Sequence, residues 1–174
     1  MTTGTAGERA RRTRVIVGVS GSVSSLAAVH RAVQEATRRQ ACGQQVELVP
    51  VAAWLPSDEP LRPLSELAHA ARRRLDVVVE QACGGRPVGL PVSPLVVQAE
   101  AGPALVAVAD RPGDLLVVGA GRPGRVSPQR PGSVTRYCRA HAGCEVLAVS
   151  ATDLLLIELE HAVHGWAGPA AAAR

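Results

Sequence analysis

Apolar runs alternate with segments of helical periodicity along most of the chain, and this alternation restricts the fold more than any other feature. The apolar runs lie at residues 15–19, 46–54, 92–100, 114–119 and 144–149. Within each run apolar residues follow one another, rather than occupying every second position, which is typical of strands covered on both faces. The sequence therefore predicts an α/β fold, a three-layer sandwich in which helices cover both faces of a five-stranded parallel sheet.

Four helices are expected between these strands. Residues 24–40 carry apolar residues three or four positions apart, which is the spacing of one helix face. A second helix is expected to begin after Pro63, a short third one at Gly102, and a fourth at Gly132. Pro50 lies inside the second apolar run and predicts an irregularity in that strand, because proline lacks a backbone N–H.

The length of 174 residues, 47% of them hydrophobic, suffices for one domain with a full core. We expect a flexible N-terminal arm at 1–13, the α/β domain at 14–150, and a tail at 151–174 that forms an extra C-terminal helix and a frayed end. Thr152 or Asp153 is expected to cap this helix. Its apolar stripe has to be buried on the domain or on a partner chain.

Composition excludes several classes of function. All 19 basic residues are Arg, so the lysine of a Walker A loop and a Schiff-base lysine are both absent. With one Tyr, two Trp and no Phe, the chain offers no aromatic platform for bases, which argues against nucleic acid as a partner. The cluster Arg72–Arg74 is interpreted as a solvated helix face. The absence of a signal sequence and of a long apolar run predicts a cytoplasmic protein that does not enter a membrane.

The cysteines do not form a convincing metal site. Cys138, His141 and Cys144 follow one another at three-residue spacing, but a fourth ligand is not evident. Buried thiols are the simpler interpretation. His161 and His164 are one helical turn apart and are interpreted as solvent-facing. We therefore expect no metal.

The stretch VIVGVSGSVSS, residues 15–25, is a strand that ends in a turn of small residues and opens a helix. Such a junction is a common place for phosphate binding, because free N–H groups point outward from a helix start. Two interpretations are open. The hydroxyls of Ser20 and Ser22 cap the helix and need no ligand, or the turn around Gly21 binds a nucleotide.

Two stretches together resemble the universal stress protein family. The first, VIVGVSGSVSSLAAVHRA, is similar to the family's opening strand, V-D-x-S turn and first helix. The second, DLLVVGAGRPGRVSPQRPGSVTRYCRAHAGCEVLAVS, is similar to its apolar strand, G-x2-G-x9-G-[S/T] loop, helix and closing strand. The resemblance covers residues 14–149. It implies the strand order 3-2-1-4-5 and a homodimer formed through the fifth strand, and it includes one branch that binds ATP and another that lacks nucleotide.

The resemblance also selects candidate nucleotide-binding residues. Gly119 falls on the first glycine of the loop, and Gly132 and Ser133 match its G-[S/T] end. Val51 falls where a second-strand residue meets the adenine, and Ser22 matches the serine of the turn. The full candidate set is Gly18, Ser20, Gly21, Ser22, Val51, Gly119, Arg122, Gly132, Ser133 and Val134.

Two of these residues depart from the family pattern. Ser20 stands where the ATP-binding branch has a carboxylate that contacts the nucleoside, and Arg122 stands in place of the second loop glycine. A glycine there allows positive φ and lets backbone N–H groups approach phosphate oxygens. Gly121 and Gly124 beside Arg122 offer another register for the turn, and the arginine itself offers a charge-assisted contact. ATP is therefore expected only as a possible cofactor of a degenerate site.

Three functions compete. The first is a stress-response module with this degenerate nucleotide site, and the second is a dimeric interaction module without nucleotide, in which the tail reinforces the dimer. The third is an adenylating enzyme of the ATP pyrophosphatase class, whose S-G-G-x-D-S loop fits Ser20, Gly21 and Ser25 but not Ser22 and Ser24. No set of residues argues for hydrolysis, so we expect neither catalytic residues nor enzymatic activity.

Overall fold

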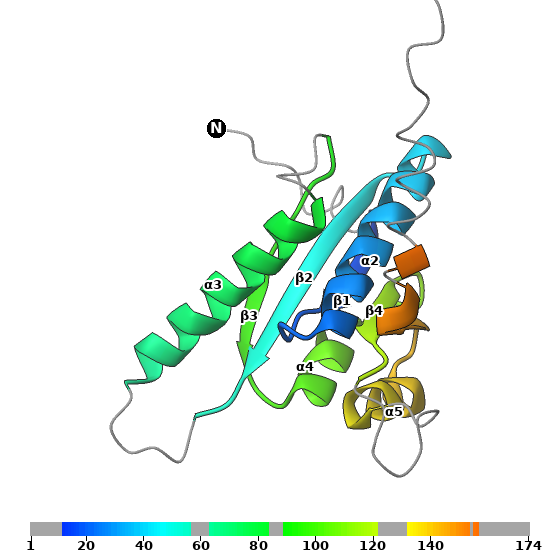
Figure 1. Ribbon diagram of the computed structural model, residues 1–174. Helices are drawn as coiled ribbons and strands as arrows, with labels where there is room; N and C mark the ends of the chain where they lie inside the picture. Colours follow the sequence, from blue (N-terminus) through cyan, green and yellow to red (C-terminus); the bar gives the residue numbers. More distant parts are fainter. Residues whose placement is uncertain (1–11, 57–62, 84–88, 122–131, 154, 157–174) are drawn as a thin grey trace, which may run out of the picture.

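The computed structural model describes residues 12–56, 63–83, 89–121, 132–153 and 155–156. Across these residues the chain forms one sheet of five parallel strands in the order β3-β2-β1-β4-β5 (Figure 1). The strands are β1 (Thr13–Gly18), β2 (Val46–Trp54), β3 (Leu95–Gln98), β4 (Leu115–Gly119) and β5 (Glu145–Val149). The predicted fold class is confirmed, and so is the strand order that the family resemblance implies.

Helices cover both faces of this sheet. They are α2 (Val23–Ala41), α3 (Leu64–Cys83), α4 (Ala101–Val108) and α5 (Ser133–His141). Helices α2 and α3 pack on one face, and α4 and α5 pack on the other (Figure 1). Within the described part of the chain, no helix combines the length and the hydropathy that a bilayer crossing needs.

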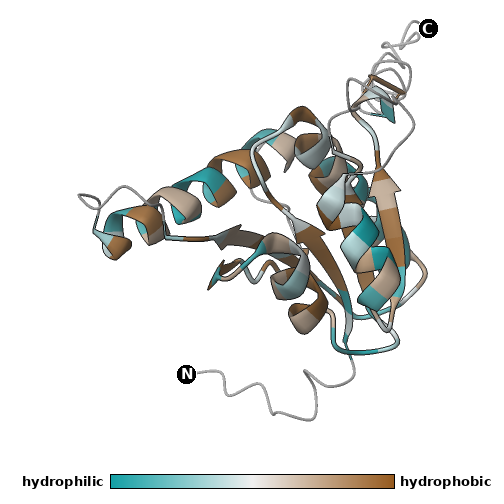
Figure 2. Cartoon of the chain, turned by 90° about the horizontal axis from the view of Figure 1, so that it is seen from below, coloured by the Kyte–Doolittle hydropathy of each residue, from teal (hydrophilic) through white to brown (hydrophobic). Residues whose placement is uncertain are grey.

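Strand β1 shows why the strands are apolar along their whole length. Successive side chains point to opposite faces of a sheet. Val15 and Val17 therefore pack against α2, whereas Ile16 packs against α4, and all three are completely buried. A central strand between two helical layers has no position that faces solvent. Figure 2 shows the result, with the strands mostly hydrophobic and the helices hydrophilic on their outer sides.

The irregularity predicted at Pro50 lies in the pairing of β2 rather than in its path. Leu48 pairs with Val92 through an isolated bridge, and regular pairing with β3 resumes only between Val51 and Leu95. Residues two apart in a strand turn their backbone groups to the same neighbour. Pro50 therefore turns its nitrogen, which has no proton, toward β3 at the gap in the ladder. As a result β3 is shorter than the predicted run 92–100.

The segment after β5 begins its helix earlier than predicted. Residues 151–153 are helical, and Ser150 is the capping residue: its Oγ accepts the N–H of Asp153 at 3.3 Å, and the Asp153 carboxylate accepts the N–H of Ser150 at 2.6 Å. This is a reciprocal capping box. The expectation that Thr152 or Asp153 caps the helix is therefore wrong. The tail beyond residue 156, with most of its apolar stripe, lies outside the described residues.

At the other end of the domain, β1 begins at Thr13, two residues before the predicted apolar run. Arg14 is consequently a residue of the sheet, and the strand also includes Thr13, which the sequence analysis assigned to the N-terminal arm. The arm itself, up to residue 11, lies outside the described residues.

Candidate functional site

A cleft of about 450 Å³ opens at the carboxyl ends of the strands, beside β1 and β4. From β1 the chain continues to β2 and β3 on one side of the sheet, and from β4 it continues to β5 on the other side. The strand order therefore reverses between β1 and β4. Open parallel sheets bind their ligands at such a point. In Figure 1 the carboxyl ends of the strands are at the lower edge of the sheet. The cleft is lined by Gly18, Val19, Ser20, Ser22, Ser24, Ser25, Val51, Ala53, Arg74, Ala101, Leu105, Val118, Gly119, Gly121, Gly132, Ser133, Val134 and Thr135.

Serine hydroxyls hold the turn between β1 and α2. Ser22 caps α2, because its Oγ accepts the N–H of Ser25 at 3.2 Å. The Oγ of Ser25 accepts the N–H of Ser20 at 2.9 Å and donates to the carbonyl of Gly18 at 3.2 Å. The hydroxyl of Ser20 lies 3.1 Å from that of Ser22. The capping interpretation is therefore confirmed for Ser22, whereas the hydroxyl of Ser20 contacts that of Ser22 and does not itself cap the helix.

The start of α5 forms the opposite side of the cleft. Gly132 is the N-cap residue, no side chain among the described residues caps this helix, and its first turn contains no acidic residue. Ser133 and Val134 of that first turn line the cleft. Backbone N–H groups in the first turn of a helix lack partners inside the helix, and the helix dipole adds positive potential there. This side of the cleft is therefore suited to an anionic group.

Gly119 is required by close packing between β4 and α2. A Cβ at this position would lie 2.8 Å from the carbonyl carbon and oxygen of Ser24, closer than real Cβ contacts allow. On the other side, the fully buried Thr135 donates its hydroxyl to the Gly119 carbonyl at 2.9 Å. Gly119 thus joins the starts of α2 and α5, which bound the cleft.

Gly121 turns the chain where it leaves the sheet. Its φ is +83°, in the left-handed region that favours glycine, and a Cβ there would lie 3.0 Å from the Cα of Gly132. The N–H of Gly132 donates to the carbonyl of Ala120 at 2.8 Å, which closes the loop at its base. The glycine conformation that the family pattern expects at Arg122 is thus adopted one residue earlier.

An apolar wall faces these polar groups. Val51 of β2 and Val118 of β4 are almost completely buried at the floor of the cleft, and Leu105 of α4 lies beside them. Leu105 packs directly on the backbone of β1, since a Cβ on Gly18 would lie 2.9 Å from its Cδ1. The cleft therefore combines an apolar surface with a rim of hydroxyls and helix starts.

The structure brings most of the candidate residues together. Eight of the ten line the cleft: Gly18, Ser20, Ser22, Val51, Gly119, Gly132, Ser133 and Val134. Gly21 belongs to the same turn, with φ of +77°, but does not itself line the cleft. Arg122, like the loop at 122–131, lies outside the described residues.

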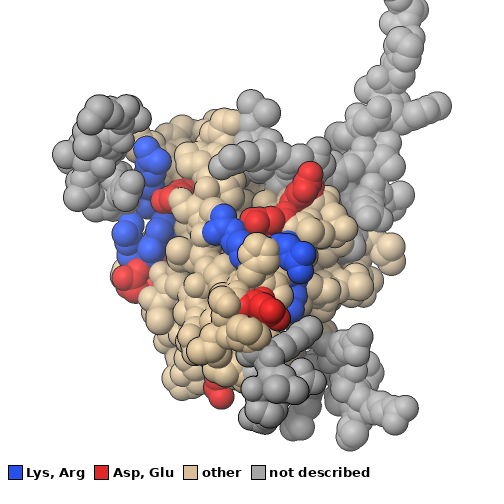
Figure 3. Space-filling model, turned by 90° about the vertical axis from the view of Figure 1, so that its left-hand side faces the viewer, with Lys and Arg blue, Asp and Glu red and all other residues tan. Residues whose placement is uncertain are grey.

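Arg74 is a lining residue that the sequence analysis missed. It belongs to α3, and the face that carries this helix mixes positive and negative side chains, as expected of a solvated surface (Figure 3). Arg72 fits that interpretation, because it is exposed and pairs with Asp76 one turn further along. Arg74, however, extends over the turn at Gly21 and into the cleft lining. No local pattern signals this position, because it depends on how α3 packs against α2.

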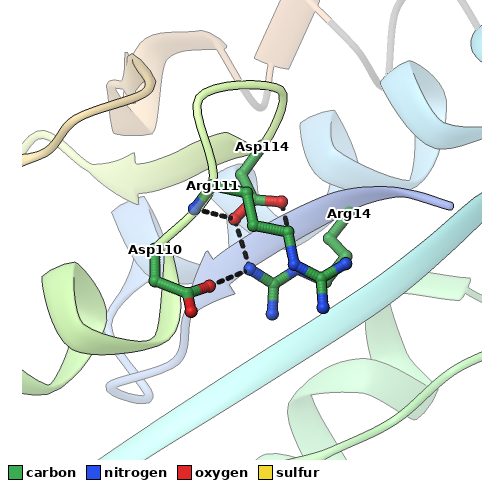
Figure 4. A network of polar contacts seen from close by, with 4 residues as sticks. All are labelled: Arg14, Asp110, Arg111 and Asp114. Atoms are coloured by element: carbon green, nitrogen blue, oxygen red, sulfur yellow. Dashed lines mark hydrogen bonds and ion pairs between the residues drawn. The ribbon is translucent and has the colours of Figure 1, made fainter. Parts of the chain in front are cut away.

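The amino edge of the sheet carries a separate charge network (Figure 4). Asp114, whose side chain is only 1% exposed, accepts hydrogen bonds from Arg14 and from the N–H of Arg111 at 3.1 Å. Arg14 also pairs with the exposed Asp110. The hydrogen bond to Asp114 raises the pKa of Arg14 above its ordinary value, and the hydrogen bond from Arg14 lowers the pKa of Asp110. All of these groups lie away from the cleft, before β4 or at the start of β1.

The two thiols near α5 are at least half-buried. Cys138 is completely buried and Cys144 is half-buried, and burial is the main cause that raises the pKa of each thiol. A raised pKa reduces the thiolate that reacts or binds metal. Among the described residues, no cluster of three or more His, Cys, Asp or Glu side chains is arranged to hold a metal ion.

A family model described as the universal stress protein family matches residues 11–150. Among solved structures, a universal stress protein in complex with cAMP is 27% identical, with a TM-score of 0.53, over 81% of this chain and 98% of that one. UspA from Lactobacillus plantarum is 23% identical, with a TM-score of 0.52, over 80% of this chain and 98% of that one. A family member from Burkholderia pseudomallei is 23% identical, with a TM-score of 0.55, over 80% and 96%. No curated protein sequence matches the chain significantly.

Proposed function

The chain belongs to the universal stress protein family, and from this premise we propose that it is a stress-response module whose cleft binds an adenine nucleotide. The observation that carries the proposal is the cleft itself, at the point where the strand order reverses. An apolar surface with a few convergent polar groups is the usual composition of a small-molecule site.

The two sides of the cleft suggest how the ligand lies. A nucleobase fits the apolar wall formed by Val51, Leu105 and Val118. A phosphate group fits the start of α5, where the N–H groups of the first turn, at Ser133 and Val134, lack partners inside the helix and Ser133 adds a hydroxyl. The complex of the 27% identical relative with cAMP supports a nucleotide as the ligand class. ATP remains a candidate, and the number of phosphates is what the experiment has to decide.

The test is calorimetric titration of nucleotide-stripped protein with ATP, AMP and cAMP, with inorganic phosphate and adenosine as controls. We expect micromolar dissociation constants for at least one nucleotide and binding at least about tenfold weaker for inorganic phosphate, because the base contributes through the apolar wall. No heat with any nucleotide at millimolar concentration would place the protein among the members that lack nucleotide.

A matched pair of variants tests where the ligand binds. Ser133→Asp places a carboxylate in the first turn of α5, inside the cleft, and should weaken nucleotide binding by about tenfold or more through charge repulsion. Ser65→Asp places the same group in the first turn of α3, outside the cleft, and should leave binding unchanged. Both changes are compatible with the helix, since acidic residues are favourable near its start. Equal affinities would exclude the α5 side as the phosphate site.

The alternative of an adenylating enzyme makes a different prediction. Such an enzyme releases pyrophosphate from ATP in the presence of its second substrate, and we propose that this protein binds nucleotide without that reaction. The pattern of the turn supports binding only, because Ser24 stands where the enzyme class has an acidic residue, and its hydroxyl lies 3.2 Å from that of Ser22. Pyrophosphate release during incubation with ATP and candidate acceptors would overturn this part of the proposal.

We also propose that the protein forms a homodimer through β5. This strand lies at the edge of the described sheet, and Val146, Leu147 and Ala148 along it are only half-buried. An edge strand with apolar residues on both faces is a natural surface for pairing with a second copy. Leu147→Arg should lower the sedimentation coefficient at micromolar concentration, whereas Leu95→Arg on the opposite edge strand should not. A monomeric wild-type protein would contradict the proposal.

A further inference from the structure

Arg74 reaches the cleft from a helix that contributes no other lining residue. It lies on α3, and its side chain crosses the turn between β1 and α2: its Cδ lies 3.2 Å, and its Nε 3.9 Å, from the position that a Cβ on Gly21 would occupy. The glycine, with φ of +77°, leaves room for this approach. The side chain therefore lies over the turn at Gly21 and forms part of the lining of the cleft.

The charge of Arg74 is not balanced by the described part of the protein. Several described arginines have acidic partners, among them Arg14 with Asp114, Arg39 with Glu35, and Arg72 with Asp76. Arg74 forms no ion pair with any described residue. A guanidinium that lines a cleft without a carboxylate partner is available to a ligand.

The rest of the described lining strengthens this positive character. None of the described lining residues is acidic, and the polar groups are the hydroxyls of Ser20, Ser22, Ser24, Ser25, Ser133 and Thr135 together with two helix starts. Sites that hold a nucleotide together with Mg²⁺ commonly supply one or two carboxylates to the metal. Here the described residues offer an arginine and hydroxyls instead.

We propose that Arg74 binds, from the turn side of the cleft, the same phosphate group that faces the start of α5, and that it supplies the positive charge that a divalent cation supplies at carboxylate-lined sites. This inference rests on the proposed function and names its ligand class more narrowly, as a nucleoside phosphate bound without a metal ion. Guanidinium groups pair with phosphate through two parallel hydrogen bonds, which lysine cannot reproduce.

The decisive comparison uses AMP and adenosine, which differ only by the phosphate. Calorimetry on wild-type protein and on Arg74→Gln should show AMP affinity reduced by about tenfold in the variant, because a hydrogen bond to a charged group is lost at an exposed site. The affinity for adenosine should change by less than about twofold. Arg74→Lys should give an intermediate affinity, since it keeps the charge but not the fork of donors.

Arg73→Gln is the matched control. Arg73 is the preceding residue of the same helix and is exposed, but it lines a separate surface groove with Ser65 and His69. The variant removes the same charge from α3 and should leave AMP affinity within about twofold of wild type. If Arg73→Gln weakens AMP binding as much as Arg74→Gln does, the effect comes from the total positive charge of α3, and the assignment to Arg74 is wrong.

The metal is tested by repeating the AMP and ATP titrations with EDTA and with millimolar Mg²⁺. We expect affinities that differ by less than about threefold between the two conditions. A gain of about tenfold or more with Mg²⁺ would overturn the proposal that Arg74 takes the place of the cation. An AMP affinity that is unchanged in Arg74→Gln would also overturn it, while leaving the proposed function intact. Wild-type protein that binds no nucleotide would instead overturn the proposed function itself.

Discussion

The two edges of the sheet differ in whether their charged side chains are paired within the protein. At the amino edge, Arg14 is bonded to Asp110 and Asp114, and Arg39 lies between Glu35 and Glu145. At the carboxyl edge, Arg74 lies over a cleft whose described lining contains no carboxylate. At the amino edge these charged side chains form ion pairs with one another. At the carboxyl edge the positive charge of Arg74 is available to a ligand.

The difference follows from where a parallel sheet places its helix starts. At the carboxyl edge each strand leads into a helix, so N–H groups and positive helix ends converge there. At the amino edge a buried carboxylate such as that of Asp114 has to be paired, because an unpaired charge in the protein interior is strongly destabilising.

The largest effect is expected at the amino edge. Asp114→Ala leaves Arg14 without its buried partner and the N–H of Arg111 without an acceptor, and should lower the free energy of unfolding by about 3 kcal/mol. Urea unfolding measures this loss. The affinity of the folded variant for AMP should not change, and a parallel loss of affinity would break the division between the two edges.

The control for this prediction is the other carboxylate of the network. Asp110→Ala removes a side chain that is 65% exposed, and its effect on stability should be much smaller than that of Asp114→Ala. Equal losses would mean that burial of Asp114 is not what makes its pairing important.

The next effect concerns the backbone of the carboxyl edge. Gly119→Ala forces a Cβ to within 2.8 Å of the Ser24 backbone and should destabilise the protein by about 2 kcal/mol, with a weakened AMP affinity as the starts of α2 and α5 separate. Gly113→Ala, at the amino edge, meets no atom within 4 Å and should be close to neutral. Thermal unfolding and calorimetry distinguish the two variants. A neutral Gly119→Ala would remove the packing argument for this glycine.

A smaller effect separates capping from binding in the serine turn. Ser22→Ala removes the cap of α2 and should lower the free energy of unfolding by about 1 kcal/mol. Ser22→Asp keeps a cap and should retain the wild-type stability, yet it adds a negative charge to the cleft and should weaken AMP binding. If Ser22→Asp binds AMP as wild type does, the phosphate lies away from this turn.

The smallest effect is the pH dependence of the ion pairs near the amino edge. The hydrogen bond from Arg38 is the main cause that lowers the pKa of Glu35, with a contribution from Arg39. A carboxyl whose pKa is lower in the folded than in the unfolded protein contributes stability above its unfolded pKa. This stability is lost as the pH falls through the folded pKa, below about 4.3 for glutamate.

Glu35→Gln tests this contribution. At pH 7 the variant should be less stable than wild type by about 0.5 kcal/mol, and the difference should vanish as the pH approaches 3. Chemical unfolding at several pH values measures it. A difference that grows on acidification would show that the sign of the coupling is reversed.

Most of the fold could be predicted because it depends on local patterns. Val15, Ile16 and Val17 are apolar in succession since both faces of β1 are covered, and this needs no knowledge of distant residues. The strand order came from the family resemblance rather than from periodicity. The cap at Ser150 was not predicted, although its signal, an S-x-x-D pattern directly after β5, is local.

Only those parts of the site that are formed by one continuous segment of the chain could be predicted from the sequence. The turn at Ser20–Ser22 and the pair Gly132–Ser133 lie at helix starts, which are visible in the sequence. Arg74 and Thr135 are not visible in this way. Arg74 reaches the cleft through the packing of α3 on α2, and Thr135 bonds to the Gly119 carbonyl across sixteen residues of chain. Both contacts are tertiary, so no single-segment pattern contains them.

Gly119 has a consequence for how such sequences are interpreted. The clash with Ser24 would arise whether or not the cleft is occupied, since it involves only the chain's own backbone. A related protein that no longer binds nucleotide would still need glycine at this position in order to fold. The glycine therefore indicates how the strand packs against the helix and not whether a nucleotide is bound. A search for nucleotide-binding proteins that relies on this glycine would also find proteins that bind no nucleotide. A change of ligand should instead be visible at side chains that folding does not require, such as Ser20 and Arg74.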